Sequence, residues 1–409
     1  MASLKKNIFY SGILTTANYL FPLITYPYVS RVLGVDNIGV CNFVDSIINY
    51  FVIISSLGIG IVGIREIAVS KNDRLRLEES FSKLFTINTI TTTIALVLLV
   101  AGIFLIPQLR VNYELMFIGV LKLLFNYLLI EWFYKGLEQF KYITNRTILV
   151  KILYVICVFL FVHDENDVLI YYFLLSFTLV INAFINIIHA RSYIRFRLSF
   201  TGLGHYFKSL SILGLYNILT SMYTTFNVAY LGFVADNIQV GYYTTSTKIH
   251  SIILMLFTAI TGVLMPRMTS LLSQGNNKEF KRLIKKSIII LCMISAPAVI
   301  IIELFAPFFI HIIAGEGYEG AIVPLRIIAP LILIIGIEQI LITQSLMPMG
   351  QDKAVLFNSA LGATVGLVLN ILLVPNLQSI GSAIVWVSCE LVVMFSASYF
   401  FLKAWKKMK

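Results

Sequence analysis

The feature that most constrains this chain is a succession of twelve apolar stretches, most of them long enough to cross a bilayer. About 20 helical residues span a hydrocarbon core of about 30 Å. The stretches cover residues 9–30, 38–63, 84–106, 113–134, 148–162, 168–190, 210–232, 240–264, 287–310, 325–347, 354–373 and 380–402. Only 12% of all residues are charged, about half the share of a soluble domain. The sequence therefore predicts an all-α polytopic membrane protein with twelve transmembrane helices.

Basic residues are concentrated on one side of this arrangement. The termini, the loops after the even-numbered stretches and the adjoining start of the fifth stretch, at Lys151, hold 26 of the 31 lysines and arginines. Cytoplasmic loops of membrane proteins carry such an excess. The bias predicts that both termini lie in the cytoplasm. It also accounts for the formal net charge of +11 without a nucleic-acid partner.

A short motif recurs halfway along the chain. The run Asp36-Asn37-Ile38-Gly39-Val40 returns as Asp236-Asn237-Ile238-Gln239-Val240, at an offset of 200 residues. Such a repeat is typical of transporters built from two related halves, although apolar helices also resemble each other by chance. The repeat predicts a first six-helix lobe at 1–190, a cytoplasmic loop at 191–208 and a second six-helix lobe at 209–409.

Polar residues follow one helix face in two of the stretches. One stripe, on the second stretch, consists of Asn42, Asp45, Asn49 and Ser56. Its counterpart on the eighth stretch consists of Thr244, Lys248 and Ser251. Hydrocarbon does not solvate polar groups, so such stripes face a bundle interior or a wet cavity. We expect both to line the site of function.

Ionisable residues within membrane stretches are functional candidates by default. They are Asp45, Lys122, Glu131, Lys248, Glu303, Glu338 and Glu390. Lys122 lies roughly 14 Å into the fourth stretch at about 1.5 Å per residue, with Asn126 on the same face. Glu303 and Glu390 stand alone among apolar neighbours. Each of these two could form a buried structural pair or bind a coupling ion.

Three cations are candidates for binding an anionic substrate: Arg31, Lys122 and Lys248. Arginine binds phosphate through a planar fork, and lysine binds it as a point charge. Arg65 and Glu66, after the second stretch, and Arg267, after the eighth, are candidates for a cytoplasmic gate.

Internal salt bridges are the alternative explanation of the buried cations. Arg31 would then pair with Asp36 or Asp45, and Lys122 would pair with Glu114 or Glu131. Under this alternative the charges stabilise the fold and do not contact a substrate.

Catalytic motifs of hydrolases, zinc proteases and P-loop enzymes are absent from the sequence. The four cysteines lie within apolar stretches and lack paired spacing. We therefore expect a transporter with no metal site and no cofactor, although a coupling ion, Na+ or H+, stays open. A membrane enzyme such as a polysaccharide polymerase would need a large outer loop, and the predicted outer loops are short.

Four motifs occur in order along the chain: Pro27-Tyr28-Val29-Ser30-Arg31-Val32-Leu33-Gly34, Gly63-Ile64-Arg65-Glu66-Ile67-Ala68, Val240-Gly241-Tyr242-Tyr243 and Gly315-Glu316-Gly317-Tyr318-Glu319-Gly320-Ala321. Their order and spacing resemble those of polysaccharide-biosynthesis flippases of the Wzx type, over nearly the whole chain. The resemblance implies membership of the MOP superfamily, which includes MATE exporters and the lipid II flippase MurJ. It implies two pseudo-symmetric six-helix bundles in a V shape around a central cationic cavity.

The resemblance also implies a function in the bacterial inner membrane. Such a flippase moves undecaprenyl-diphosphate-linked oligosaccharide repeat units to the outer leaflet by alternating access, for O-antigen, capsule or exopolysaccharide biosynthesis. Its partners would be membrane lipid, a polysaccharide polymerase and glycosyltransferases, and Arg31 would carry over as a cavity cation. The alternative is a MATE-like, cation-coupled exporter of small amphipathic molecules, for which a cationic cavity is unfavourable when the cargo is a cation.

Overall fold

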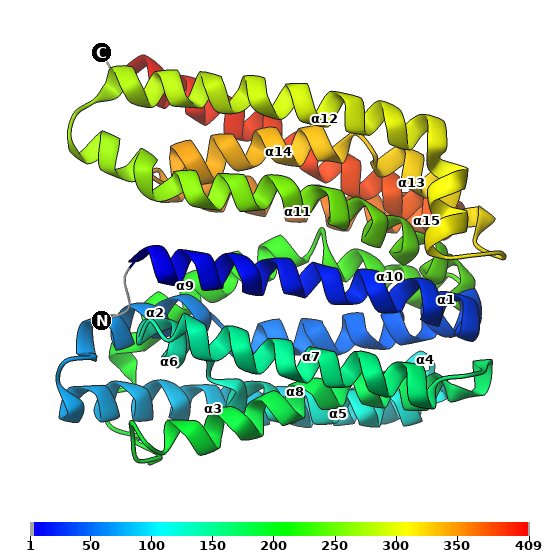
Figure 1. The fold of residues 1–409 in the computed structure, drawn as a ribbon, viewed down its shortest axis with the longest axis horizontal. Coiled ribbons are helices and arrows are strands. Elements are labelled where there is room, and N and C mark those ends of the chain that lie inside the picture. Colours follow the sequence, from blue (N-terminus) through cyan, green and yellow to red (C-terminus); the bar gives the residue numbers. More distant parts are fainter. Residues whose placement is uncertain (1–3, 408–409) are drawn as a thin grey trace. The chain divides into compact units, whose positions relative to one another are not determined.

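The computed structural model describes residues 4–407 and is all-helical (Figure 1). For a few of these residues, most of them between 253 and 267, only the backbone is described. Eight of the described helices are long and apolar enough to cross a membrane. Two of the eight have 48 and 55 residues, about twice what one crossing needs. The all-α membrane class is thus confirmed, while the twelve-span, two-bundle arrangement stays a prediction.

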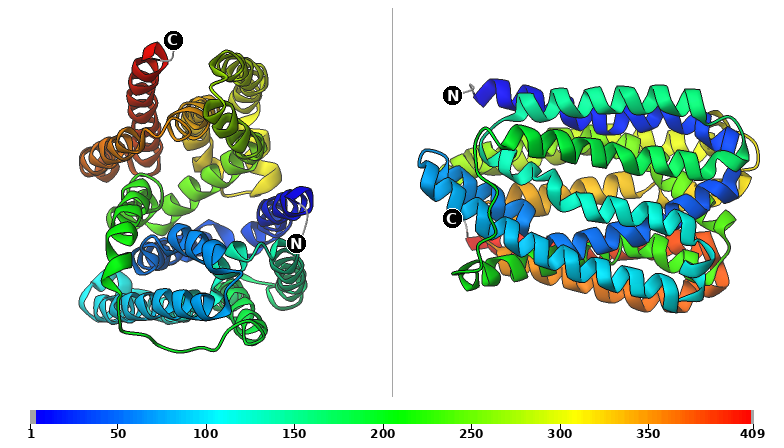
Figure 2. Two further views of the ribbon diagram at one scale, coloured as in Figure 1. Left: turned by 90° about the vertical axis from the view of Figure 1, so that its left-hand side faces the viewer. Right: turned by 90° about the horizontal axis from the view of Figure 1, so that it is seen from below.

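The chain forms two compact units. The first contains the chain up to Leu33 and Val40–Ile218, and the second contains Gly34–Gly39 and the chain from Leu219 onward. Within each unit the long helices run roughly along one direction and are seen nearly end-on in Figure 2 (left). The domain boundaries expected at 190 and 209 stay a prediction.

The helices of the first unit include most of α1 and most of α9. In chain order they are α1 (Leu4–Ser56), α2 (Ile59–Ser70), α3 (Arg74–Leu105), α4 (Pro107–Val111), α5 (Tyr113–Asn126), η1 (Tyr127–Leu129), α6 (Glu131–Gly136), α7 (Phe140–Phe161), η2 (Glu165–Asp167), α8 (Val168–Ala190) and α9 (Gly204–Ser221).

The second unit contains the remaining helices, including one π-helical segment. They are α10 (Thr225–Val234), α11 (Asn237–Ser273), α12 (Asn277–Ile313), η3 (Glu319–Ala321), α13 (Ile322–Ile328), α14 (Leu331–Leu341), the π-helical η4 (Ile342–Leu346) and α15 (Asp352–Lys407).

A single residue with positive φ divides each of the two longest helices. In α1 it is Gly34, with φ 74°, at the first residue of the turn that the sequence predicts. Glycine lacks a Cβ atom and adopts this conformation without strain. In α15 it is Gln378, with φ 50°, between the two predicted spans that end at 373 and begin at 380.

The helix α7 is longer than the sequence analysis expected. It begins at Phe140, whereas the predicted span begins at 148. Arg146, which lies before the predicted span, therefore belongs to a helix. The cause is that hydropathy detects lipid-facing residues, while a helix begins where its backbone hydrogen bonds begin.

The Nζ of Lys151 lies 5.8 Å from the ring centroid of Phe21, in cation–π geometry.

An aromatic cluster around Phe81 forms the core at one end of the first unit. The Phe81 ring centroid lies 5.1 to 5.4 Å from those of Phe85, Trp132, Phe133 and Phe196. Phe81 and Phe133 are fully buried. Aromatic pairs at these distances add stability beyond the area that they bury. The cluster holds α3 against α6 and against the segment after α8.

Glycine allows close backbone packing where both copies of the repeated motif meet in the second unit. A Cβ atom added to Gly39 would lie 1.8 Å from the carbonyl oxygen of Asn237. One added to Gly241 would lie 2.4 Å from the carbonyl oxygen of Val35. Any larger residue at either position would push these two backbone segments apart. The equivalence of the two halves of the chain stays a prediction.

Replacing Gly63 by alanine should destabilise the protein, whereas the same change at Gly60 in the same helix should not. A Cβ atom on Gly63 would lie 2.6 Å from Cε3 of Trp132, whose ring is held by the Phe81 cluster. Gly60 is exposed and has nothing within 4 Å of an added Cβ atom. Overpacking costs about 1–3 kcal/mol. Thermal unfolding of the detergent-solubilised protein measures both variants, and equal melting temperatures would contradict this packing.

Candidate functional site

The polar stripe on the second half of α1 lies against α5 and α8 within the first unit. The Nζ of Lys122 on α5 is 2.6 Å from Oδ1 of Asp45. The hydroxyl of Tyr172 on α8 donates to the same oxygen at 3.3 Å. Asn49, one turn after Asp45, donates from Nδ2 to Oδ2 at 2.8 Å. The Asp45 carboxylate therefore has partners on both oxygens, from its own helix and from two others.

Small and polar residues bring α5 close to this stripe. A Cβ atom added to Gly119 would lie 2.5 Å from Cγ1 of Ile48, so glycine permits the close approach of the two helices. Further along, Nδ2 of Asn126 donates to Oγ of Ser56 at 3.5 Å. Asn42 is half-buried at the other end of the stripe. Residues that the sequence placed on two separate helix faces thus form one seam.

Lys122 has an internal acidic partner, although a different one from those considered in the sequence analysis. Its partner is Asp45, whereas Glu114 accepts a hydrogen bond from Tyr113 and Glu131 binds Lys135 and Arg146. The side chains of the Lys122–Asp45 pair are 17% and 25% exposed. An anionic ligand at this lysine would also meet the carboxylate, so the pair would have to open or the carboxylate would have to be protonated.

Arg31 and Lys248 belong to different units. Arg31 is exposed, and its Nη1 donates to the carbonyl oxygen of Pro27 one turn earlier in α1. Lys248 is half-buried on α11. Its neighbours Thr244 and Ser251 donate their hydroxyls to α11 carbonyls one turn earlier. A single cavity lined by the three cations stays a prediction.

The gate candidates are described only in part. Arg65 and Glu66 are neighbours on α2, and their side chains form an ion pair at 3.3 Å. The arginine side chain is 63% exposed, and ion pairs of this kind contribute about 0–1 kcal/mol. The side chain of Arg267 lies outside the described residues. The gate role stays a prediction.

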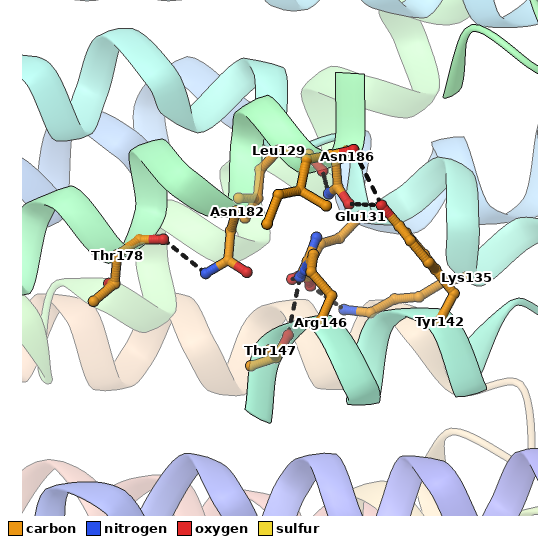
Figure 3. Close-up of polar contacts among 10 residues, drawn as sticks. Leu129, Glu131, Lys135, Tyr142, Arg146, Thr147, Thr178, Asn182 and Asn186 are labelled. Carbon is orange, nitrogen blue, oxygen red and sulfur yellow. Dashed lines mark hydrogen bonds and ion pairs between the residues drawn. The ribbon is translucent and has the colours of Figure 1, made fainter. Parts of the chain in front are cut away.

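A buried polar cluster that the sequence analysis missed lies between α6 and α7 (Figure 3). Arg146 on α7 is 5% exposed. Its Nη2 donates to Oε1 of Glu131 at 3.0 Å and to Oγ1 of Thr147 at 3.0 Å. The Nζ of Lys135 lies 3.1 Å from the other oxygen of Glu131. The Nε and Nη1 of Arg146 are buried and have no hydrogen-bond partner in the described part of the chain.

A break in the backbone places Glu131 in this cluster. The chain between α5 and α6 passes through Ile130, with φ 38°. The break leaves the carbonyl oxygen of Leu129 outside a regular helix, and Nδ2 of Asn186 on α8 donates to it. The hydroxyl of Tyr134 donates in turn to the backbone carbonyl of Asn186 at 2.6 Å. The sequence analysis named Glu131 among the ionisable candidates but missed Arg146. The spacing of Glu131 and Lys135 also suits an i, i+4 pair.

The Lys122–Asp45 pair and the cluster around Glu131 differ in net charge. The Lys122–Asp45 pair is neutral, whereas two cations surround the single carboxylate of Glu131. Close to Arg146, Oδ1 of Asn182 is also buried without a partner among the described residues. A guanidinium whose Nε and Nη1 have no hydrogen-bond partner, and which carries an uncompensated charge, is able to bind a phosphate group.

Removing one member of the Lys122–Asp45 pair should destabilise the protein more than removing both. Breaking a fully buried pair costs about 3–5 kcal/mol because it leaves one charge without a partner, and partial exposure reduces that cost here. We expect Lys122→Met and Asp45→Asn each to lower abundance in the membrane and thermal stability, and the double variant to recover most of both.

The surface pair Lys71–Glu138, at 2.7 Å, provides the matched control for this comparison. Lys71→Met should change stability by no more than about 1 kcal/mol, because solvent already stabilises both charges. A double variant that is as unstable as the sum of its single variants would refute the coupling of Lys122 and Asp45.

Two family models match the chain. Residues 4–272 match the family described as polysaccharide biosynthesis protein. Residues 213–372 match the MatE family.

Two curated relatives cover nearly the whole chain. The "Putative O-antigen transporter" of Escherichia coli (strain K12) is 27% identical over 404 residues, which are 96% of this chain and 95% of the relative. The protein of the same name from Shigella dysenteriae is 26% identical over 416 residues, which are 98% and 100% of the two chains.

Solved structures of transporters share the fold. The lipid II flippase MurJ, in an inward closed conformation, has a TM-score of 0.79 at 12% identity, covering 98% of this chain and 90% of its own. An inward-facing multidrug resistance MATE transporter of the MOP superfamily has a TM-score of 0.69 at 16% identity, covering 95% and 94%. At these identities the likeness concerns the fold alone.

Proposed function

This chain belongs to the polysaccharide biosynthesis protein family, and we propose that it is a flippase for undecaprenyl-diphosphate-linked oligosaccharide repeat units. It would carry them from the cytoplasmic to the outer leaflet by alternating access, for the synthesis of O-antigen, capsule or exopolysaccharide. The names of its relatives and its fold support a transporter for a lipid-linked glycan. Glycosyltransferases would supply the substrate and a polymerase would use it.

The observation that carries the proposal is the positive charge held within membrane helices. Buried ionisable residues are costly in a membrane and are retained where they act on a ligand. We infer that Arg31, Lys122 and Lys248 contact the substrate diphosphate, and that Arg146 joins them through Nε and Nη1. An exporter of cationic molecules would instead need acidic residues that are not paired with lysine or arginine.

The proposal includes an arrangement in the membrane. Twelve helices would form two six-helix bundles around a central cavity in the bacterial inner membrane, with both termini in the cytoplasm. The sugar and diphosphate would occupy the cavity while the polyprenyl chain stays in lipid. The backbone is non-helical at Gly34 in α1 and at Gln378 in α15. These two breaks divide the two longest helices and support a count of twelve transmembrane helices.

Replacing Arg31 by alanine should abolish surface polysaccharide while the protein still inserts. Lysine at this position should rescue only in part, because it keeps the charge and loses the bidentate fork. Likewise, Lys248→Arg should retain more function than Lys248→Ala. Mass analysis of lipid-linked intermediates in a deletion strain that carries each variant measures the effect.

Protein abundance is measured in the same strains as the control. Normal export from a well-expressed Arg31→Ala protein would eliminate this arginine as a substrate ligand. Unchanged surface polysaccharide in the deletion strain itself would favour the alternative, a MATE-like exporter of small molecules.

The charge bias predicts the topology. Reporter fusions at the C-terminus and within residues 191–203 should report the cytoplasm, because 26 of the 31 basic residues fall on that side. A fusion in the acidic loop at His163–Asp167 should report the outside. A cytoplasmic signal from that loop would refute the twelve-span arrangement.

A further inference from the structure

The first half of α1 and the helix α7 run side by side in the first unit and form an apolar groove (Figure 2). Near the start of α7, the hydroxyl of Thr144 donates to the carbonyl oxygen of Tyr10 at 2.9 Å. At the other end, the hydroxyl of Tyr28 donates to the carbonyl oxygen of Val162, the residue after α7, at 2.7 Å. The two helices are therefore held together at both ends, and most of the groove lies between these contacts.

The groove is large enough for a ligand. Its volume is about 490 Å³, and ligand pockets commonly have about 300–1,000 Å³. The residues that line it on α1 recur every three or four positions, so they form one face of that helix. The lining includes Phe9, Gly12, Ile13, Thr16 and Leu20 from α1, and Ile148 from α7. Apart from Thr16, the described lining is apolar.

A glycine keeps the groove open. A Cβ atom added to Gly12 would meet nothing within 4 Å. Glycine inside a helix lowers stability relative to alanine, and close packing against a neighbour is a common reason for it. No neighbour requires glycine at this position, so its effect here is to leave space in the groove.

A lysine without a carboxylate partner lies beside the groove. Lys151 is half-buried, halfway along α7. It forms no ion pair with an acidic side chain that the structure describes. Its ammonium group lies instead over the ring of Phe21, which lines the groove. An aromatic ring stabilises a cation only modestly, so this charge within a membrane helix is a candidate for binding a ligand.

An apolar groove with one cation beside it fits a ligand that has a long apolar chain next to an anionic group. A free phosphate ion would gain nothing from the apolar lining, and a neutral lipid would leave the charge of Lys151 without a partner. A groove between two parallel helices suits a single chain better than the two acyl chains of a phospholipid. A polyprenyl phosphate combines one apolar chain with an anionic group at its end.

We propose that the groove between α1 and α7 binds the part of a polyprenyl chain that adjoins its phosphate, and that Lys151 binds the phosphate. The rest of the chain stays in lipid. This site is separate from the cations Arg31, Lys122 and Lys248, and it would hold the lipid-linked substrate when those cations do not. The role in transport rests on the proposed flippase function, whereas the binding of polyprenyl phosphate does not.

Site-specific photo-crosslinking of the purified full-length protein tests the groove without any transport. A photoreactive amino acid replaces either Leu20, which lines the groove, or Ile24, which lies one turn further along α1 and is not in the described lining. These side chains are 48% and 47% exposed, so they are matched in access. With undecaprenyl phosphate as the probe, we expect labelling from position 20 to exceed that from position 24 about tenfold. Equal labelling would overturn the proposal, and so would full competition by an equal concentration of phosphatidylglycerol.

Variants of Lys151 test the role of the charge in the protein that carries the photoreactive residue at position 20. Lys151→Met should lower the labelling about tenfold, because the phosphate loses its counter-charge, whereas Lys151→Arg should keep it. Lys281→Met is the matched control, since Nζ of Lys281 lies 5.1 Å from the ring centroid of Trp405 in the second unit. Unchanged labelling in Lys151→Met would overturn the role of this lysine. An equal loss in Lys281→Met or in Lys151→Arg would also overturn it.

Reconstituted vesicles then test the role in transport. Gly12→Leu should fill the groove and keep the fold, because its Cβ atom meets nothing and leucine favours helix. Gly60→Leu is the control, at an exposed and equally open position of α2. Only Gly12→Leu should slow the movement of lipid-linked oligosaccharide, and an unchanged rate would overturn the role in transport. Failure of the wild type to move any lipid-linked oligosaccharide would refute the proposed function, while the crosslinking would still decide whether the groove binds polyprenyl phosphate.

Discussion

Charges within the membrane helices of this chain must be neutralised inside the protein, because hydrocarbon offers neither water nor counter-ions. The structure shows two such groups of charges. Lys122 and Asp45 neutralise each other, and Glu131 is placed between the two cations Lys135 and Arg146. The Lys122–Asp45 pair joins α5 to α1 and the Arg146–Glu131 pair joins α7 to α6, so these interactions also decide which helix faces pack together.

The sequence identifies polar residues on both sides of the seam between α1 and α5, but it predicts neither the seam nor the pairing of Lys122 with Asp45. The spacing of polar residues places Asp45 on the polar face of one helix. Lys122 lies so deep within its apolar stretch that its side chain cannot easily reach the membrane–water interface. The partner itself depends on the relative height and rotation of two helices, because a lysine side chain reaches several positions on a neighbour. Arg146 was missed for another reason. Thr144, Arg146 and Thr147 near the start of α7 are polar yet buried, so hydropathy assigned them to a loop.

Some breaks in the helices can be predicted from the residue type, and others depend on tertiary packing. The break at Gly34 has a signal in the sequence, since glycine favours positive φ. Ile130 and Gln378 also have positive φ, although neither residue type favours it. Their conformations are imposed by the packing around them.

The assignment of Gly34–Gly39 to the second unit has a consequence for dividing the chain. These six residues are connected on both sides to the first unit, yet Val35 and Gly39 pack backbone against backbone with α11. If the gene were split in the segment between α8 and α9, the C-terminal fragment would lack the peptide that covers Gly241. The two fragments would therefore be incomplete when produced separately and would complement each other only when they are produced in the same cell.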